Sequence, residues 1–228
     1  MELTAFAQWL NTAFSGYDQA ILSALHRAAE HLGGLLTPLM KLITLLGEKG
    51  ILFFLLALGM MCFSRSRKTG VCLFGAVACG ALITNIILKD WVARPRPFET
   101  VELFRQFWTA VGSPAEDGFS FPSGHVTAAA AGMTALSLNR GKKWILPSVL
   151  VVLLMAVSRN YLVAHYPSDV LFAALFGLLS GLIAWVITRG IFDYLDDNDD
   201  LPWCGAILNW NLSLPLPSRN SYHGRHEK

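Results

Sequence analysis

The sequence predicts an all-α integral membrane protein built around a bundle of five transmembrane helices. Of the 228 residues, 54% are hydrophobic and only 15% are charged, whereas a soluble domain of this length carries about 25% charged residues. The apolar residues are also concentrated in long runs, and residues 69–88 and 170–188 contain no Asp, Glu, Lys or Arg. Each run matches the roughly 20 apolar residues that a helix needs to cross a bilayer.

Five segments have the composition of membrane-crossing helices. They lie near residues 50–63, 69–88, 121–138, 144–158 and 167–188. The first, third and fourth are short in apolar residues, so we expect their ends to extend into flanking polar positions. This divides the chain into an N-terminal segment (1–48), a transmembrane bundle (49–190) and a polar tail (191–228).

The N-terminal segment has the pattern of an amphipathic helix. Its apolar residues recur at alternating steps of three and four, which places them on one stripe. They are Leu22, Leu25, Ala29, Leu32, Leu36, Leu39, Ile43 and Leu46. We expect one helix, or two that break near Gly33 and Gly34, lying on the membrane surface or against the bundle. A sixth span is the alternative, although Lys41 would be costly in hydrocarbon, and a coiled-coil dimer is a third interpretation.

The loops predict how the bundle is oriented. Residues 64–68 and 139–143 form short loops rich in Lys and Arg, and such loops favour the cytoplasmic side. The tail from Arg189 then also lies on the cytoplasmic side. The long connection 89–120 and the turn 161–167 are thereby placed on the extracytoplasmic face of the cell membrane.

Composition argues against several functional classes. The net charge is +2 and no basic stripe is present, so a nucleic-acid partner is not expected. The four cysteines show no CxxC spacing, so neither a zinc site nor a disulfide scaffold is predicted. The tail carries an acidic run, Asp193, Asp196, Asp197, Asp199 and Asp200, which we interpret as a solvated segment and not as a cation site. The sequence therefore predicts no metal site and no cofactor.

Three polar clusters border the apolar spans, and the first is KDWVARPRP at residues 89–97. Because it directly follows a span, Lys89, Arg94 and Arg96 are expected at the membrane surface. Arginine offers a planar fork of donors that fits phosphate oxygens, and lysine adds a compact positive charge. The alternative is the ordinary placement of long cationic side chains at a membrane interface.

The second cluster, FPSGH at residues 121–125, opens an alanine-rich apolar helix. Ser123 suits the N-cap position, and the first turn would present free backbone N–H groups to an anion. Gly124 allows the backbone to approach an oxyanion closely, and His125 could donate a proton to a departing oxygen. The alternative is a capped helix with an interfacial histidine.

The third cluster, SRNYLVAHYPSD at residues 158–169, connects the last two spans. Pro167 suits the first turn of the final helix, which leaves His165 at the mouth of that helix. Asp169 is expected to accept a hydrogen bond from one imidazole nitrogen, so that the other is unprotonated, as a nucleophile requires. Arg159 ends the preceding span and is expected to face the same pocket, because charged groups at this depth tend to be functional.

The predicted topology places all three clusters on one face of the membrane. Together they supply cations, a helix-terminal amide site, a candidate acid and an oriented nucleophile, which is the set that phosphoryl transfer requires. In order and spacing, the clusters resemble the three signatures of the type 2 phosphatidic acid phosphatase (PAP2) superfamily. The matching patterns are Lys89-(six residues)-Arg96-Pro97, Pro122-Ser123-Gly124-His125 and Ser158-Arg159-(five residues)-His165-(three residues)-Asp169.

The resemblance implies a role for each matched residue. The residues implied for phosphate binding are Lys89, Arg96, Ser123, Gly124 and Arg159. His165 would attack phosphorus and form a phosphohistidine, with its tautomer held by Asp169. His125 would protonate the leaving oxygen and then help water to release phosphate. Arg94 matches no fixed position and is treated as an auxiliary contact. The family acts without a metal ion, and its membrane members often have six spans.

The resemblance also implies a lipid phosphate or diphosphate as the substrate, taken from the surrounding membrane lipids. Undecaprenyl diphosphate is the preferred prediction because the chain is compact, and phosphatidylglycerol phosphate and phosphatidic acid are the alternatives. Two other classes remain. One is a lipid phosphotransferase of the same fold, and the other is a non-enzymatic lipid-binding membrane protein. The second gives no reason for His165 and Asp169 at their spacing.

Overall fold

The computed structural model describes residues 3–212, and in this part of the chain all regular secondary structure is helical. The helices are α1 (Ala5–Ala13), α2 (Ser15–Leu46), α3 (Ile51–Met61), α4 (Ser64–Ala81), α5 (Lys89–Val92), α6 (Pro97–Thr100), α7 (Glu102–Ala110), α8 (Gly124–Arg140), α9 (Ile145–Tyr161), α10 (Pro167–Asp197) and α11 (Pro202–Asn209). The short helical turns Glu48–Gly50 and Lys142–Trp144 precede α3 and α9, and the π-helical segment Leu82–Leu88 extends α4. The predicted all-α fold class is confirmed.

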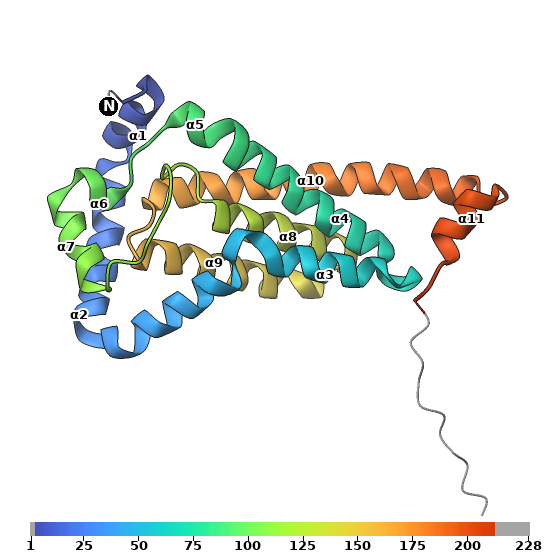
Figure 1. Ribbon diagram of the computed structural model, residues 1–228, viewed down its shortest axis with the longest axis horizontal. Coiled ribbons are helices and arrows are strands. Elements are labelled where there is room, and N and C mark those ends of the chain that lie inside the picture. Colours follow the sequence, from blue (N-terminus) through green and yellow to red (C-terminus); the bar gives the residue numbers. More distant parts are fainter. Residues whose placement is uncertain (1–2, 213–228) are drawn as a thin grey trace, which may run out of the picture.

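Helices α3, α4, α8, α9 and α10 run along the long axis and form the bundle (Figure 1). They match the five predicted spans in position, with α8 at the centre. Within residues 3–212, the helical stretches that are long and apolar enough to cross a membrane are Ser15–Met61, Ser64–Thr100, Lys142–Tyr161 and Pro167–Asp197. Because α8 has only 17 residues and is not among them, the count of five spans stays a prediction.

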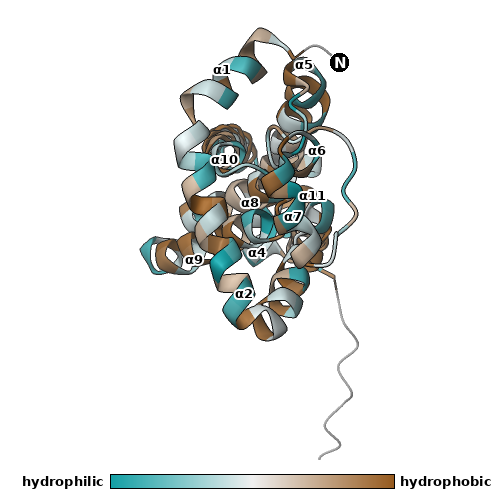
Figure 2. Cartoon of the chain, turned by 90° about the vertical axis from the view of Figure 1, so that its left-hand side faces the viewer, coloured by the Kyte–Doolittle hydropathy of each residue, from teal (hydrophilic) through white to brown (hydrophobic). Residues whose placement is uncertain are grey.

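The outer faces of the bundle are apolar, as expected for helices surrounded by lipid. Leu175, Leu179 and Val186 of α10 and Leu146 and Leu153 of α9 are all exposed. An apolar surface of this extent is unfavourable in water but costs nothing against lipid tails, which are as apolar as leucine. Figure 2, viewed from the end of the bundle, shows hydrophobic residues on the outward sides of several helices. The chain is therefore a multi-pass membrane protein.

Helices α8 and α10 approach each other through small residues. A Cβ added at Gly177 would lie 2.6 Å from the carbonyl oxygen of Thr127, and one added at Gly181 would lie 2.6 Å from Cβ of Thr134. Glycines four residues apart on one helix face permit this backbone contact. Close packing fixes the N-terminus of α8 relative to that of α10, and these two ends carry the second and third polar clusters.

The N-terminal helices α1 and α2 cover one end of the bundle (Figure 1), where α2 crosses the end and then bends back towards α3. The buried Asp18 of α2 accepts hydrogen bonds from the backbone N–H (2.7 Å) and the hydroxyl (2.8 Å) of Ser168. Thr37 and the Tyr161 hydroxyl are also hydrogen-bonded, at 2.9 Å. Among the predicted arrangements, α2 therefore adopts packing against the bundle.

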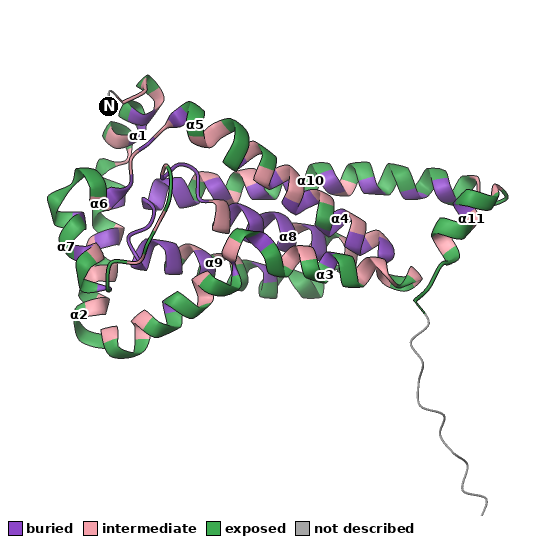
Figure 3. Ribbon diagram, in the orientation of Figure 1, coloured by how far each residue is buried: buried purple, intermediate pink, exposed green. Residues whose placement is uncertain are grey.

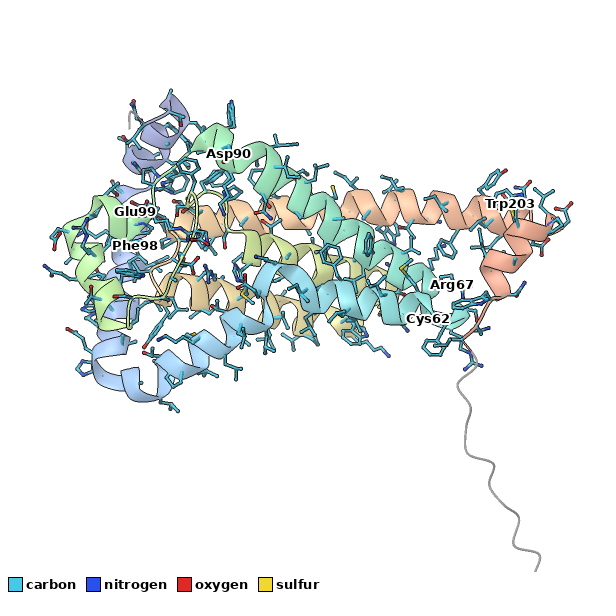
Figure 4. The ribbon with its side chains drawn as sticks, viewed as in Figure 1. Cys62, Arg67, Asp90, Phe98, Glu99 and Trp203 are labelled. Atoms are coloured by element: carbon cyan, nitrogen blue, oxygen red, sulfur yellow. The ribbon has the colours of Figure 1, made fainter. Side chains whose placement is uncertain are left out.

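The opposite end carries the basic residues 64–68 and the C-terminal helices; the sequence predicts a loop over these residues, but they make up the first turns of α4. Figure 4 labels Cys62, Arg67 and Trp203 at this end, far from Asp90 and Glu99 at the other. The Arg67 guanidinium donates to backbone carbonyls at the end of α11, among them that of Leu208 at 3.0 Å, and a cation is favoured there by the helix dipole.

The acidic run predicted to be a solvated tail begins inside a helix. Helix α10 continues to Asp197, so Asp193 and Asp196 lie on its last turns, and Asp193 pairs with Lys68 at 3.5 Å. The polar end of the tail, residues 218–228, lies outside the described residues. The two ends of the bundle thus differ in chemistry, with the three polar clusters gathered at the end that α2 covers.

Candidate active site

A cavity of about 800 Å³ opens at the end of the bundle that α2 covers. It is lined by residues of all three polar clusters, namely Lys89, Arg96, Gly124, His125, Arg159 and His165. Figure 3 shows that buried residues gather where α8, α9 and α10 reach this end. The close packing of α8 on α10 and the short connection between α9 and α10 bring the clusters together. Lys89 and His165 are 76 positions apart in the sequence.

His165 lies in the connection between α9 and α10 and is buried. Its Nδ1 lies 2.6 Å from the carbonyl oxygen of Ser120. Because a carbonyl can only accept a hydrogen bond, Nδ1 carries the proton and Nε2 is left with a free lone pair. Burial, with the nearby guanidinium groups of Arg96 and Arg159, holds the pKa of His165 well below its usual value of 6.5. The imidazole is therefore neutral at physiological pH, as a nucleophile requires.

Asp169 does not hold the imidazole directly, and here the sequence-based expectation is corrected. Its Oδ2 accepts hydrogen bonds from the hydroxyl of Ser120 at 2.5 Å and from the backbone N–H of Tyr166 at 3.0 Å. The acceptor for His165 is instead the carbonyl of the same Ser120. Asp169 therefore fixes Ser120 and the start of α10, and it acts on His165 only through them.

Arg94 is a structural residue and not an auxiliary phosphate contact, which corrects the second expectation. It is buried, and its Nη1 and Nη2 pair with Asp169 (2.5 Å) and Asp18 (3.0 Å). Its guanidinium also lies 3.8 Å over the ring of Tyr166. Buried charges are stable when paired and hydrogen-bonded, so Arg94 joins α2 to the start of α10 behind the cavity.

Arg159 and Arg96 both face the cavity, with Glu116 between them. The Glu116 carboxylate lies 2.5 Å from Nη2 of Arg159 and 3.1 Å from Nη1 of Arg96. Arg96 also donates to the carbonyls of Gly118 (2.9 Å) and Ala164 (2.8 Å). In contrast, Nε and Nη1 of the buried Arg159 have no partner among residues 3–212. Two guanidinium groups that share one carboxylate are spaced to share a phosphate as well.

Lys89, Ser123 and Gly124 complete the predicted phosphate-binding set. Lys89 lines the cavity beside Gly118. Ser123 occupies the N-cap of α8, as predicted, but its hydroxyl caps no backbone group, and no described residue hydrogen-bonds it although it is buried. A Cβ at Gly124 would lie 2.9 Å from Oδ1 of Asn85. The glycine therefore makes room for Asn85, which reaches the cavity from the π-helical segment.

His125, in the first turn of α8, lines the cavity. Its Nε2 lies 3.3 Å from Oε2 of Glu48, in the turn that joins α2 to α3. Like the Ser120–His165 contact, this one links an imidazole of a motif to a residue outside all three motifs.

Sequence reasoning missed five residues that the fold brings to the site, namely Asp18, Glu48, Asn85, Glu116 and Ser120. A weak signal existed for one of them, because Asp18 is the sole acidic residue in the first turn of α2. For the others no local pattern distinguishes a residue at the cavity from one facing solvent or lipid.

Comparison with known proteins identifies a family. The PAP2 superfamily matches residues 69–193 of the chain. The undecaprenyl-diphosphatase BcrC of Bacillus subtilis is 30% identical over 164 residues, which cover 72% of this chain and 80% of the relative. An undecaprenyl-diphosphatase of Sulfolobus acidocaldarius is 31% identical over 119 residues, covering 52% of this chain and 54% of the relative.

Among solved structures, a PAP2-type phosphatidylglycerolphosphate phosphatase from Bacillus subtilis has a similar fold. The TM-score is 0.59 at 24% sequence identity, and the match covers 82% of this chain and 90% of that structure. At this identity the likeness concerns the fold alone.

Proposed function

This chain belongs to the PAP2 superfamily, and we propose that it is a membrane phosphatase that removes phosphate from a lipid phosphate or diphosphate through His165. The predicted family is confirmed by the family match over residues 69–193, and the names of the relatives support the class of lipid phosphatase. The residue roles and the substrate are the parts that we propose.

One observation carries the proposal. The unprotonated Nε2 of His165 and the Nε and Nη1 donors of Arg159, which no residue in the described part of the chain accepts, belong to residues that line the same cavity. A buried guanidinium with free donors is costly unless an anion binds it. A neutral imidazole beside such a site is placed to attack the anion's central atom.

The phosphate site combines charges with amides. We propose that Arg159, Arg96 and Lys89 neutralise the phosphate oxygens. Ser123 and the first-turn N–H groups of α8 donate from the other side, because a helix N-terminus favours negative charge. Charge that builds on the equatorial oxygens during transfer is then stabilised without rearrangement of the site.

In the first step, Nε2 of His165 attacks phosphorus. The new N–P bond forms as the bond from phosphorus to the lipid oxygen breaks, and the leaving oxygen takes a proton from His125. Asp169 acts as a positioning residue through Ser120, whose carbonyl accepts the Nδ1 hydrogen of His165 and stabilises the positive charge that the ring gains on attack.

In the second step, water replaces the lipid. His125, which is neutral after the first step, accepts a proton from water as the water oxygen attacks phosphorus. The N–P bond then breaks, so that His165 returns to its neutral form and inorganic phosphate leaves. No electron donor or acceptor is required, and both histidines end in their initial protonation states.

For the substrate we propose a polyprenyl diphosphate, with undecaprenyl diphosphate as the best single choice. The cavity is lined by cationic side chains of Lys41, Lys49, Lys89, Arg96 and Arg159 and by the acidic side chains of Glu48, Glu116 and Asp117, so the choice of a diphosphate rests on the relatives. Two relatives bear the name undecaprenyl-diphosphatase. Phosphatidylglycerol phosphate, named for the similar structure, and phosphatidic acid are the alternatives.

We further propose that the cavity faces the extracytoplasmic side of the cell membrane. The basic first turns of α4 and the end of α10 meet at the opposite end of the bundle, where Lys68 pairs with Asp193. Lys and Arg at the ends of spans favour the cytoplasm, which supports a cytoplasmic position for the C-terminal end of α10 and therefore an extracytoplasmic position for the cavity.

Release of inorganic phosphate by the purified protein tests the proposal. We expect phosphate from undecaprenyl diphosphate in detergent, less from phosphatidylglycerol phosphate and phosphatidic acid, and turnover that persists in EDTA. Transfer of the phosphoryl group to an added lipid or saccharide without phosphate release would instead identify a phosphotransferase. Binding of these lipids without either reaction would identify a non-enzymatic lipid-binding protein.

A further inference from the structure

The two histidines of the cavity are held by acceptors of different charge. His165 donates to a neutral carbonyl, that of Ser120, at 2.6 Å. His125 faces the carboxylate of Glu48, with 3.3 Å between Nε2 and Oε2. A carbonyl leaves an imidazole neutral, whereas a carboxylate favours the imidazolium. The two acceptors thus match the opposite tasks of a nucleophile and an acid.

The turn that carries Glu48 is packed tightly against the site. A Cβ added at Gly47 would clash with Met155 of α9 and would lie 3.5 Å from Cδ2 of His125. A Cβ at Gly50, where φ is +70°, would lie 3.2 Å from that of Ala128 in α8. Glycine is therefore favoured at Gly50 by its positive φ and by the close approach to α8, and Gly47 leaves room for the Met155 side chain. This packing holds the carboxylate beside the ring.

The surrounding charges make a carboxylate necessary at this position. Cations from several elements line the same cavity as His125: Arg159 on α9, Lys89 at the start of α5, Arg96 before α6, Lys41 on α2 and Lys49 next to Glu48. His165 lies across the cavity, and Glu116 is engaged by Arg96 and Arg159. Nearby cations oppose protonation of the imidazole, yet a general acid must be protonated before it can donate.

We propose that Glu48 is a positioning residue for His125: its carboxylate accepts the Nε2 hydrogen, orients the ring and stabilises the imidazolium. Among the described residues none hydrogen-bonds Nδ1 of His125, which leaves that N–H for the departing lipid oxygen. The proposal rests on the phosphatase function above and assigns to a turn of the N-terminal region a part in its acid–base chemistry.

The test uses the isosteric variant Glu48→Gln and two leaving groups. A long-chain alkyl phosphate has a poor leaving group that needs protonation, whereas 4-nitrophenyl phosphate does not. We expect kcat/KM, which covers the steps up to release of the leaving group, to fall roughly 100-fold for the alkyl phosphate, since general acids contribute about 100-fold or more. For 4-nitrophenyl phosphate the expected change is less than about threefold. The matched control is Glu30→Gln on the exposed face of α2, which should change neither value.

The pH profile gives a second readout that a purely structural role would not move. Loss of the Glu48 charge, with Arg159, Lys89, Arg96, His165 and Glu116 unchanged, should shift the basic limb of kcat/KM for the alkyl phosphate to lower pH by about one unit. Equal slowing of both substrates with an unmoved basic limb would overturn the proposal. Unchanged kinetics in Glu48→Gln would overturn it as well.

A measurement independent of turnover separates this inference from the proposed function. The ¹⁵N shifts of the His125 ring report its protonation whether or not the protein hydrolyses a lipid. We expect the imidazolium to persist to a higher pH in the unaltered protein than in Glu48→Gln. Coincident titrations would overturn the inference, whereas failure of the phosphatase function itself would appear as absence of phosphate release by the unaltered protein.

Discussion

Two groups of residues at the site differ in how fully their polar groups are satisfied: an inner wall that lies mostly behind the cavity, and an outer wall that lines it. We define the inner wall as Asp18, Arg94, Ser120, His165 and Asp169, all of which are buried and joined to one another by hydrogen bonds or ion pairs. A fully satisfied polar network in a low dielectric is rigid and specifies one arrangement. The inner wall therefore fixes the geometry of the nucleophile.

The outer wall consists of Glu48, Lys89, Glu116, His125 and Arg159, which line the open part of the cavity. Here the polar groups are not all hydrogen-bonded, since two donors of Arg159 have no partner among the described residues. The Glu116 carboxylate bridges Arg159 to Arg96. Groups left without partners in a buried site are available to a ligand. The comparison teaches that one wall holds the site in shape and the other receives the phosphate.

The largest effect should follow from a change to the inner wall at the nucleophile. Replacing His165 by Gln removes the atom that attacks phosphorus, and we expect phosphate release to fall by at least about four orders of magnitude. Circular dichroism should show a folded protein, because the residue lies in a connection and not inside a helix. The exposed His31→Gln is the control. More than 1% residual activity would place the nucleophile elsewhere.

A change at Asp18, in the inner wall, should lower the free energy of unfolding. Asp18→Asn leaves the buried Arg94 with one carboxylate in place of two and weakens the cap on Ser168. Because breaking a buried pair strands a charge, we expect a loss of about 3 kcal/mol in the free energy of unfolding. Denaturant unfolding in detergent measures this value. A loss below about 0.5 kcal/mol would show that the inner wall does not depend on its full set of partners.

The neutral state of His165 predicts how stability depends on pH. Burial, then Arg96 and Arg159, hold its pKa in the folded protein well below 6.5, while the unfolded chain binds a proton near 6.5. The stability that the folded protein has with neutral His165 is thus fully present above pH 6.5. As the pH falls below 6.5, the free energy of unfolding decreases, with a slope of up to about 1.4 kcal/mol per pH unit. Thermal unfolding from pH 7.5 to 5 should show a weaker slope in His165→Gln. Parallel curves for the two proteins would contradict this prediction.

The smallest effect should come from the outer wall, at the carboxylate that occupies the arginines. In Glu116→Gln an incoming anion no longer has to displace a charged group from Arg96 and Arg159. We expect vanadate to inhibit this variant more tightly, by up to about tenfold or ~1.4 kcal/mol. Inhibition that weakens instead would show that Glu116 orients the arginines in the complex, and the contrast between the walls would then be smaller than proposed.

The sequence by itself determined the all-α membrane fold and the three polar clusters. Apolar runs long enough to cross a bilayer and the patterns at residues 89–97, 121–125 and 158–169 are local features, and local spacing suffices to find them. The start of α10 at Pro167 and the N-cap position of Ser123 also followed from local rules. Each of these inferences needs only residues that are neighbours in the chain.

Tertiary structure alone decided which groups hold the histidines and the arginines. Arg94 stands two residues from Arg96, yet its carboxylate partners Asp18 and Asp169 lie 76 and 75 residues away. Glu48 reaches His125 across 77 residues of sequence. A guanidinium binds a carboxylate and a phosphate through the same fork of donors. Only the packing of distant helices could therefore decide which cation faces the cavity and which is buried behind it.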